Sequence, residues 1–432
     1  MIEGFRDAFR LPDLKRRILF VIGALFIFRL GAYIPTPGIN AAEMSRFFAS
    51  REQGMLGFLN LLTGGALSRF GIFALGVGPY INSSIVMQLL TGAFPALAKM
   101  QKDEKGEGRK KITQYTRIAT IFFALVQAVG LIAWLRNLNV FTGGYFEWLL
   151  AVSTVTTGAV VVMWLGEVMS DHGIGNGTSM LIYAGIVARL PRTVIDTAGR
   201  VISVQFNIVA VIAAVAVVMA VIVGCIYLQE GKRRLPVQYA KRQVGNKVYE
   251  GRNTFIPLPI NPGGVIPIIF ATSVLLFPYT IASFFEGSTV ADAFRKVFSP
   301  DHAVYMVIEV LLIIAFSYFY KEIAINPGEW AGNMKDHGGA VSGYRPGRQT
   351  ADYIVKVMNR ITLCGALALS VIQLIPNLIS QVIKVETLAF GGTAIIIVVG
   401  VALDTVQQIE SQLLARHFEG IVKRQRKSGR LL

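Results

Sequence analysis

The chain has 432 residues, of which 53% are hydrophobic and only 16% charged, and its formal net charge is +16. A soluble domain would carry about a quarter charged residues, so this composition excludes an ordinary soluble protein and indicates a membrane protein. The excess of Lys and Arg lies between apolar runs, where membrane topology explains it before nucleic-acid binding needs to be considered.

Nine apolar runs are long enough to cross a membrane as helices, which takes about 17–25 residues. They lie at residues 18–34, 74–94, 118–135, 149–169, 208–228, 265–285, 303–320, 361–379 and 388–406. A tenth, shorter run at 178–190 follows Gly175, Asn176 and Gly177. The first run is predicted to be a retained span, because no small-residue cleavage site follows it.

The basic residues decide whether the short run 178–190 crosses the membrane. If it does, 29 Lys and Arg residues lie on one side and 8 on the other, and 5 lie within or at the ends of spans. If it does not, the later loops change sides and the split becomes 17 against 21. The positive-inside rule therefore predicts ten spans, with both termini in the cytoplasm.

The segment from Leu56 to Phe70 is apolar enough to enter a membrane and too short to cross it. Counting it as a span would spoil the charge distribution of the loops. We therefore expect it to dip in from the outer side, which requires surrounding protein or a watery cavity. The alternative is a helix that lies flat on the outer leaflet.

Ten spans divide into two sets of five, residues 1–200 and 201–432, whose orientations would be opposite. Interrupted spans at matching positions favour this inverted repeat: the second span of the first half opens with GVGPYI (76–81), and its counterpart opens with GGVIPII (263–269). Gly and Pro are also common in membrane helices generally, which leaves a chance match as the alternative. The predicted fold is all-α and polytopic, with a re-entrant segment.

Charged side chains are few within the predicted spans: Arg29 lies in the first and Glu309 in the eighth, while Glu167, Arg360 and Asp404 lie near span ends. A coupled carrier usually needs a relay of such groups near the midplane, and no relay is predicted. The interrupted spans instead carry mildly polar residues, which we expect to hydrogen-bond between helices for about 1 kcal/mol or less each. Mildly polar residues of this kind are compatible with a helix interface that opens and equally with a static helical bundle.

Two long loops, residues 229–262 and 321–356, mix basic residues with Tyr, Pro and Gly, and the C-terminal tail is also basic. This mixture predicts ordered hairpins that could dock an acidic or RNA-rich partner, although the positive-inside rule alone explains the charge. No phosphate loop, zinc-binding histidine pair or nucleophile elbow occurs. We therefore predict no catalytic residue, metal or cofactor.

Eight stretches, spread in order along nearly the whole chain, resemble the SecY/Sec61-alpha family. They are LKRRILFVIGALFIFRLGAYIPTPGI (14–39), LLTGGALSRFGIFALGVGPYINSSIVMQLL (61–90), GRKKITQYTR (108–117), GIGNGTSMLIYAGIVARLP (173–191), VQYAKRQVG (237–245), GVIPIIFA (264–271), YRPGRQT (344–350) and AFGGTAIIIVVGVALDT (389–405). The resemblance implies the protein-conducting channel of the Sec translocon, which passes unfolded polypeptides across a membrane and releases membrane segments into lipid. It implies no enzyme activity, since ATP hydrolysis would come from a partner motor.

The resemblance also implies roles for individual residues. A plug would seal the outer side: Leu61, Leu62, Thr63, Gly64, Gly65, Ala66, Leu67, Ser68, Arg69 and Phe70. A pore ring would consist of Val77, Ile81, Ile182, Ile269 and Ile397. Such an aliphatic collar is narrow and dry, so it opposes ion leakage yet yields around a peptide. Val77 stands where the family often has isoleucine, which allows a slightly wider or rearranged collar.

A lateral gate is implied between spans two and three and spans seven and eight. Its candidate residues are Ser83, Ser84, Gln88, Gln127, Thr272 and Ser273. The candidates for docking a SecA ATPase or a translating ribosome are Lys241, Arg242 and Arg345. The other implied partners are SecE, SecG, signal sequences, nascent polypeptides and lipid, at the bacterial cytoplasmic (inner) membrane.

Two other classes of protein remain as alternatives. An inverted-repeat secondary transporter of a small solute also uses broken helices, but it usually carries midplane charge. The permease half of a pump with an external ATPase would need a coupling helix and a defined substrate pocket. A ring of aliphatic residues without polar specificity fits neither class well.

Overall fold

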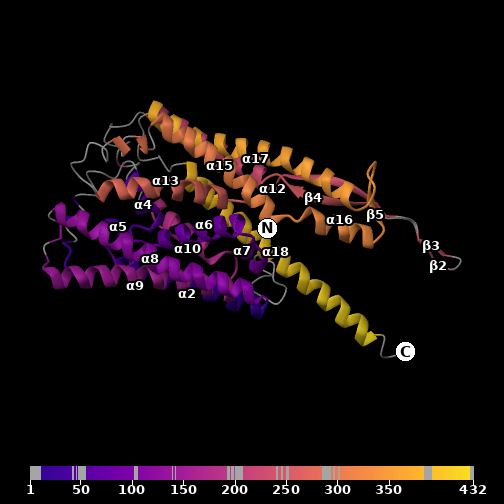
Figure 1. Cartoon of the computed structure of the whole chain (residues 1–432), viewed down its shortest axis with the longest axis horizontal. Helices are drawn as coiled ribbons and strands as arrows, with labels where there is room; N and C mark the ends of the chain where they lie inside the picture. The colour runs from indigo at the N-terminus through magenta and orange to yellow at the C-terminus, as the bar shows by residue number, and fades with distance from the viewer. Residues whose placement is uncertain are drawn as a thin grey trace. The chain divides into compact units, whose positions relative to one another are not determined.

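A computed structural model gives the fold, which is mostly helical (Figure 1). It describes residues 11–40, 43–44, 46, 55–101, 106–138, 140–141, 143–191, 195, 199, 208–239, 242–244, 247–249, 253–284, 293–294, 297–299, 302–383 and 392–428. The helices are α2 (Pro12–Tyr33), α4 (Met55–Leu62), α5 (Ala66–Arg69), α6 (Gly78–Ala93), α7 (Pro95–Gln101), α8 (Glu107–Asn137), α9 (Tyr145–His172), α10 (Gly177–Val187), α12 (Ile208–Glu230), α13 (Ile266–Phe284), α15 (Ala303–Ala324), α16 (Pro327–Asp336), α17 (Arg348–Ile383) and α18 (Gly392–Ser428).

Six helices among the described residues are long and apolar enough to cross a membrane. Helices α6 and α7 would add a seventh, bent by 109° at the break between them. The predicted count of ten therefore stays a prediction. Helix α6 begins four residues after the predicted start of its apolar run at residue 74, because the chain there forms turns that include Gly76 at positive φ (+53°).

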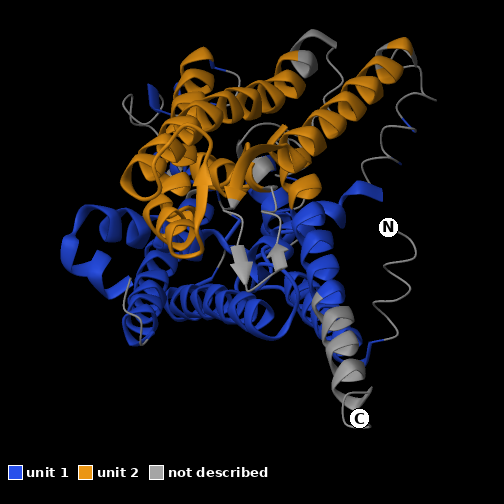
Figure 2. Cartoon of the chain, turned by 90° about the vertical axis from the view of Figure 1, so that its right-hand side faces the viewer, with its two compact units in different colours: residues 1–205, 273–302, 401–432 blue, residues 206–272, 303–400 orange. Residues whose placement is uncertain are grey.

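The chain forms two compact units (Figure 2). Unit 1 comprises residues 1–205, 273–302 and 401–432, and unit 2 comprises residues 206–272 and 303–400. Helix α13 therefore divides between the units at Ser273, and α18 divides at Val401. The predicted inverted halves, divided near residue 200, stay a prediction.

Unit 1 is a helical bundle in which α8 packs against α6 and α9, and α9 packs against α2 and α10. One of its cores gathers aliphatic and aromatic side chains from α8, α9 and the predicted plug segment, including Leu67, Phe70, Ile132, Trp134 and Val155. The short helices α4 and α5 are thus part of the packed interior of unit 1. This placement is what defines the candidate site.

Unit 2 packs α17 against α12 and α15, and it carries a small sheet built from the two long loops (Figure 1). The sheet order is β4 (Asn253–Pro259), β1 (Lys232–Tyr239), β5 (Gly339–Val341), with both pairs antiparallel. A second pair joins β2 (Arg242–Val244) to β3 (Lys247–Tyr249).

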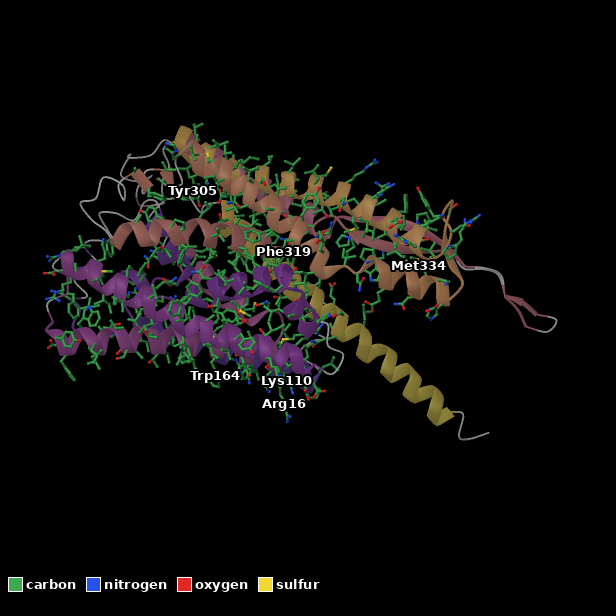
Figure 3. All side chains as sticks on the ribbon, in the orientation of Figure 1. Arg16, Lys110, Trp164, Tyr305, Phe319 and Met334 are labelled. Atoms are coloured by element: carbon green, nitrogen blue, oxygen red, sulfur yellow. The ribbon has the colours of Figure 1, made fainter. Side chains whose placement is uncertain are left out.

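The sheet packs on a hydrophobic core shared with α16 and the first turns of α17. Leu235 and Leu258 contribute from the sheet, Met334 from α16 (Figure 3) and Ile354 from α17. Burial of these apolar side chains gives the loops a core of their own, which accounts for order in segments that the sequence marks mainly by charge.

Candidate functional site

The predicted plug consists of two short helices joined by a tight turn. Asn60 organises this turn: its side-chain oxygen accepts a hydrogen bond from the Ser68 amide (2.9 Å), and its carbonyl accepts one from the Gly65 amide (2.8 Å). The hydroxyl of Thr63 donates to the same carbonyl (3.2 Å) and accepts from the Leu67 amide (3.3 Å). Gly64 and Gly65 both adopt positive φ, which suits glycine. The segment is therefore a defined structure rather than a loose loop.

Helix α2 contacts the plug through two side chains. The Arg29 guanidinium donates from Nη1 to the Gly64 carbonyl at 2.7 Å. The Tyr33 ring lies 4.1 Å from the guanidinium carbon of Arg69 and 5.5 Å from that of Arg29. Both distances are within the range of cation–π attraction. The charge at Arg29 that the sequence revealed thus has a partner in the plug.

Helix α10 approaches the backbone of the predicted plug closely at Gly185. A Cβ atom added at Gly185 would lie 3.1 Å from the Gly64 nitrogen and 3.2 Å from both Gly64 Cα and the Leu62 carbonyl oxygen. A Cβ at Gly64 would in turn lie 3.1 Å from Gly185 Cα. The two segments are therefore seated against each other with no room for a side chain on either.

A cavity of about 80 Å³ lies beside the plug within unit 1. Its lining is mostly apolar and comes from the plug, α6, α8, α10 and the Ser273–Thr280 part of α13. Three of the five predicted ring residues line it, namely Val77, Ile81 and Ile182. The plug residues Leu62, Thr63 and Leu67 line it as well. Ring and plug residues from distant parts of the sequence therefore meet at one cavity.

The other two ring residues, Ile269 and Ile397, are buried in unit 2, with 7% and 1% of their surface exposed. The closed ring of five stays a prediction. Its three members in unit 1 have the shape and chemistry that a hydrophobic constriction needs.

The predicted gate residues behave differently from one another. Gln127 and Ser273 line the cavity beside the plug. The Ser83 hydroxyl instead donates to the Pro79 carbonyl (2.9 Å), and the Thr272 hydroxyl donates to Ile268 (3.0 Å), both within their own helices. For these two residues the expected bond between helices is wrong, because a hydroxyl in an apolar helix is satisfied most simply by the carbonyl four residues earlier.

The pair Ser84 and Gln88 likewise bonds within α6, with the amide of Gln88 donating to the Ser84 hydroxyl at 3.0 Å. One contact between helices on this side of the bundle is aromatic: Phe123 of α8 meets Phe277 of α13 edge to face at 6.0 Å between ring centroids. Such a contact can part without leaving an unpaired polar group.

Arg345, a candidate docking residue, is exposed in the loop that follows β5. Its carbonyl accepts a hydrogen bond from the Thr350 hydroxyl (2.8 Å), and the neighbouring Tyr344 stacks on Tyr353 with ring centroids 4.1 Å apart. These contacts fix the loop backbone and leave the guanidinium in solvent. Lys241 and the side chain of Arg242 lie outside the described residues.

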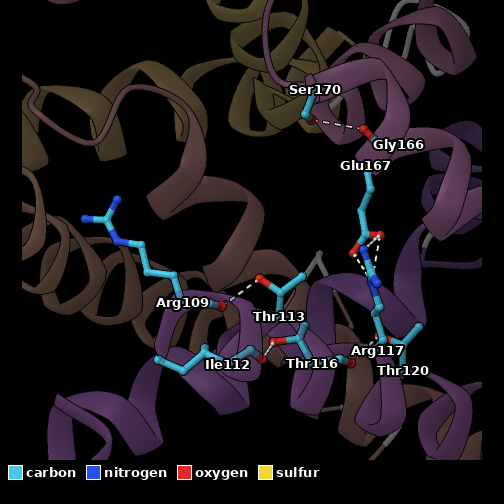
Figure 4. A network of polar contacts seen from close by, with 9 residues as sticks. All are labelled: Arg109, Ile112, Thr113, Thr116, Arg117, Thr120, Gly166, Glu167 and Ser170. Atoms are coloured by element: carbon cyan, nitrogen blue, oxygen red, sulfur yellow. Dashed lines mark hydrogen bonds and ion pairs between the residues drawn. The ribbon is translucent and has the colours of Figure 1, made fainter. Parts of the chain in front are cut away.

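Sequence reasoning missed an ion pair between α8 and α9 (Figure 4). The Arg117 Nε donates to both carboxylate oxygens of Glu167, at 3.1 Å to Oε1 and 2.9 Å to Oε2, and Nη2 lies 2.8 Å from Oε2. The available signal was topological: Arg117 lies at the start of one predicted span and Glu167 near the end of the next. The start of one span and the end of the next lie at the same depth in the membrane when the two spans are antiparallel.

Sequence reasoning also missed a buried pair in unit 2. The Gln373 amide of α17 donates to the carboxyl group of Glu309 on α15, and both side chains are at least 98% buried. Two spans are thereby joined at a polar point inside an apolar interface. The lone Glu309 was visible in the sequence, but its partner was one of several Gln residues in spans.

The six apolar helices that are long enough to cross a membrane, and the bent pair α6 and α7, define a multi-pass helical membrane protein with a mostly apolar cavity in unit 1. The SecY family matches residues 71–406. The chain is 39% identical to the protein translocase subunit SecY of Thermus thermophilus, with 100% of both chains covered. It is 42% identical to that of Escherichia coli K12, covering 96% of this chain and 95% of the relative.

Solved structures agree on the fold. One described as showing that the plug domain of SecY stabilises the closed state of the translocation channel matches with a TM-score of 0.68 at 17% identity, covering 93% of each chain. Sec61 in the canine ribosome–channel complex matches with a TM-score of 0.64 at 18% identity and the same coverage. The chain belongs to the SecY family, and it is a channel subunit for protein translocation rather than an enzyme.

Proposed function

We propose that secretory polypeptides pass through this chain along the cavity beside the plug, with Val77, Ile81 and Ile182 forming part of the constriction. The observation that carries the proposal is that ring and plug residues line one cavity. A dry aliphatic constriction opposes the passage of hydrated ions, because it offers no group that replaces their water. The plug adds a second barrier next to it.

The lateral exit is proposed to involve α6, α8 and α13 in unit 1, with Gln127 and Ser273 facing the path. These two residues line the same cavity, and the aromatic contact of Phe123 with Phe277 closes α8 against α13. A signal sequence is itself an apolar helix, so it can replace such contacts at little cost in hydration. The buried hydroxyls of Ser83 and Thr272 remain satisfied within their helices during such a change.

The proposed partners follow from family and charge. A SecA-type ATPase or a translating ribosome would bind the exposed basic loops at Arg345, with Lys241 and Arg242 as further contacts. The match to Sec61 in a ribosome–channel complex supports the ribosome as one partner. SecE and SecG would complete the complex in the bacterial cytoplasmic membrane, and the positive-inside rule puts both termini in the cytoplasm.

Site-specific photo-crosslinking tests the path. A photoreactive residue at Ile81, Ile182 or Ile397 should crosslink to a stalled secretory chain, in a reaction that needs a functional signal sequence and ATP. The matched control is Trp164 of α9, which is 58% exposed and points outward (Figure 3). Equal crosslinking at Trp164 and the ring positions, or small-solute uptake without crosslinks, would overturn the proposal.

A further inference from the structure

Arg29 is the one charged side chain in the predicted span 18–34, and a charge within a span needs a partner inside the protein. The Gly64 carbonyl supplies it, at 2.7 Å. This carbonyl lies in the break between α4 and α5, where regular helical hydrogen bonding is interrupted. The Arg29 guanidinium and the Gly64 carbonyl therefore satisfy each other's need for a hydrogen-bond partner. This hydrogen bond exists only while the plug is in its closed position.

Tyr33 lies four residues after Arg29, on the same face of α2. Its ring has the Arg69 guanidinium over it at 4.1 Å, and Arg69 is the last residue of α5. Arg29 and Tyr33 thus hold α5 at both ends, just before its first residue and at its last. A rigid short helix held at two points can turn only about the line that joins them.

Backbone hydrogen bonds tie the chain that follows the plug to the chain that follows α2. The Thr36 amide donates to the Phe70 carbonyl (3.0 Å), and the Ile72 amide donates to the Ile34 carbonyl (2.9 Å). These bonds do not depend on side-chain identity. The two side-chain contacts at Arg29 and Tyr33 are therefore the part of this attachment that can be released while the backbone tie acts as a hinge.

We propose that Arg29 and Tyr33 are positioning residues that latch the plug in its closed position, and that opening the channel requires both contacts to break. The inference rests on the proposed role of residues 61–70 as a plug. It assigns to α2, a helix that contributes nothing to the predicted ring or gate, control over how readily the channel opens.

The test compares resting channels in the complete translocase reconstituted in lipid. Arg29→Met and Tyr33→Leu each remove one contact, whereas Arg29→Lys and Tyr33→Phe keep a donor and a ring. We expect Arg29→Met and Tyr33→Leu to raise resting ion conductance about tenfold, because each loses a contact that involves a charged group. Arg29→Lys and Tyr33→Phe should conduct at nearly the wild-type level. Arg69→Met removes the Tyr33 contact from the plug side and should match Tyr33→Leu.

A second readout follows the plug itself. Ser68→Cys, in a chain whose Cys225 and Cys364 are replaced, should react faster with an impermeant thiol reagent added from the outer side when the latch is broken. Equal labelling and conductance for Arg29→Met, Arg69→Met and wild type would overturn the latch. Deletion of residues 61–70 separates the two proposals: a tight membrane after deletion would overturn the plug, whereas a leaky deletion with tight latch variants would overturn the latch alone.

Discussion

Replacement of Gly185 by alanine should unseat the plug without weakening the helix that carries the change. The new methyl group would lie 3.1–3.2 Å from backbone atoms of Gly64 and Leu62, which cannot turn aside as a flexible side chain would. Overpacking of this kind costs about 1–3 kcal/mol. Alanine favours a helix by about 1 kcal/mol over glycine, but α10 is helical whether the plug is in or out, so that gain cancels.

The closed state should therefore lose about 2 kcal/mol relative to open states, which is roughly a 30-fold shift in their ratio. The assay is ion conductance of resting channels in planar bilayers, with thermal unfolding in detergent measured alongside. Gly23→Ala on α2 is the matched control, because a Cβ there meets nothing within 4 Å. Raised conductance with unchanged or higher thermal stability is expected for Gly185→Ala alone.

The reasoning would be refuted if Gly185→Ala conducted no more than Gly23→Ala. It would equally fail if conductance rose only together with a large loss of thermal stability, since the effect would then be general unfolding. A larger residue provides a graded check: Gly185→Leu should leak more than Gly185→Ala, because the overlap with the plug backbone grows with side-chain volume.

Three further outcomes are expected. Ile269→Asn or Ile397→Asn should improve export of a reporter with a defective signal sequence, because a polar collar weakens the closed state; unchanged export would count against the ring. Arg345→Glu should reduce motor-driven export more than membrane targeting, and equal loss of both would make the loop merely structural. Gln373→Leu should lower the free energy of unfolding by about 1–3 kcal/mol, because a buried carboxyl oxygen of Glu309 loses its donor. Adding Glu309→Leu should restore most of the loss, and a Gln373→Leu variant as stable as the double variant would contradict this.

Much of the helical fold could be predicted from apolar runs, because length and hydropathy are properties of contiguous sequence. The start of α6 could not. The second predicted span begins at residue 74, but α6 begins at Gly78, since Gly76 adopts positive φ and the chain there forms turns. The order in loop 229–262 was visible in its composition, whereas the pairing of β1 with β5 depends on contacts between residues about a hundred positions apart.

The candidate site also combines features that the sequence predicts with features that it does not. The segment 61–70 stands out because it is apolar and too short to cross, and Arg29 stands out as a charge in a span. The hydrogen bond between Arg29 and this segment does not stand out in the sequence. Its acceptor is the carbonyl of Gly64, and every residue has a carbonyl. Sequence patterns can therefore mark a side chain that needs a partner and still give no sign of a partner made of backbone.

Glycines within helices show most clearly that sequence patterns do not reveal contacts made to a backbone. Gly23, Gly31 and Gly185 all lie within apolar helices, where glycine is common and carries little information. A Cβ at Gly31 would overlap the ring of Phe73, one at Gly185 would press on the plug backbone, and one at Gly23 would meet nothing. Close approach of another segment, not helix propensity, separates the required glycines from the replaceable one. The close approach of Gly185 to Gly64 is such a case, and it becomes visible only when the backbones of α10 and the predicted plug are placed together.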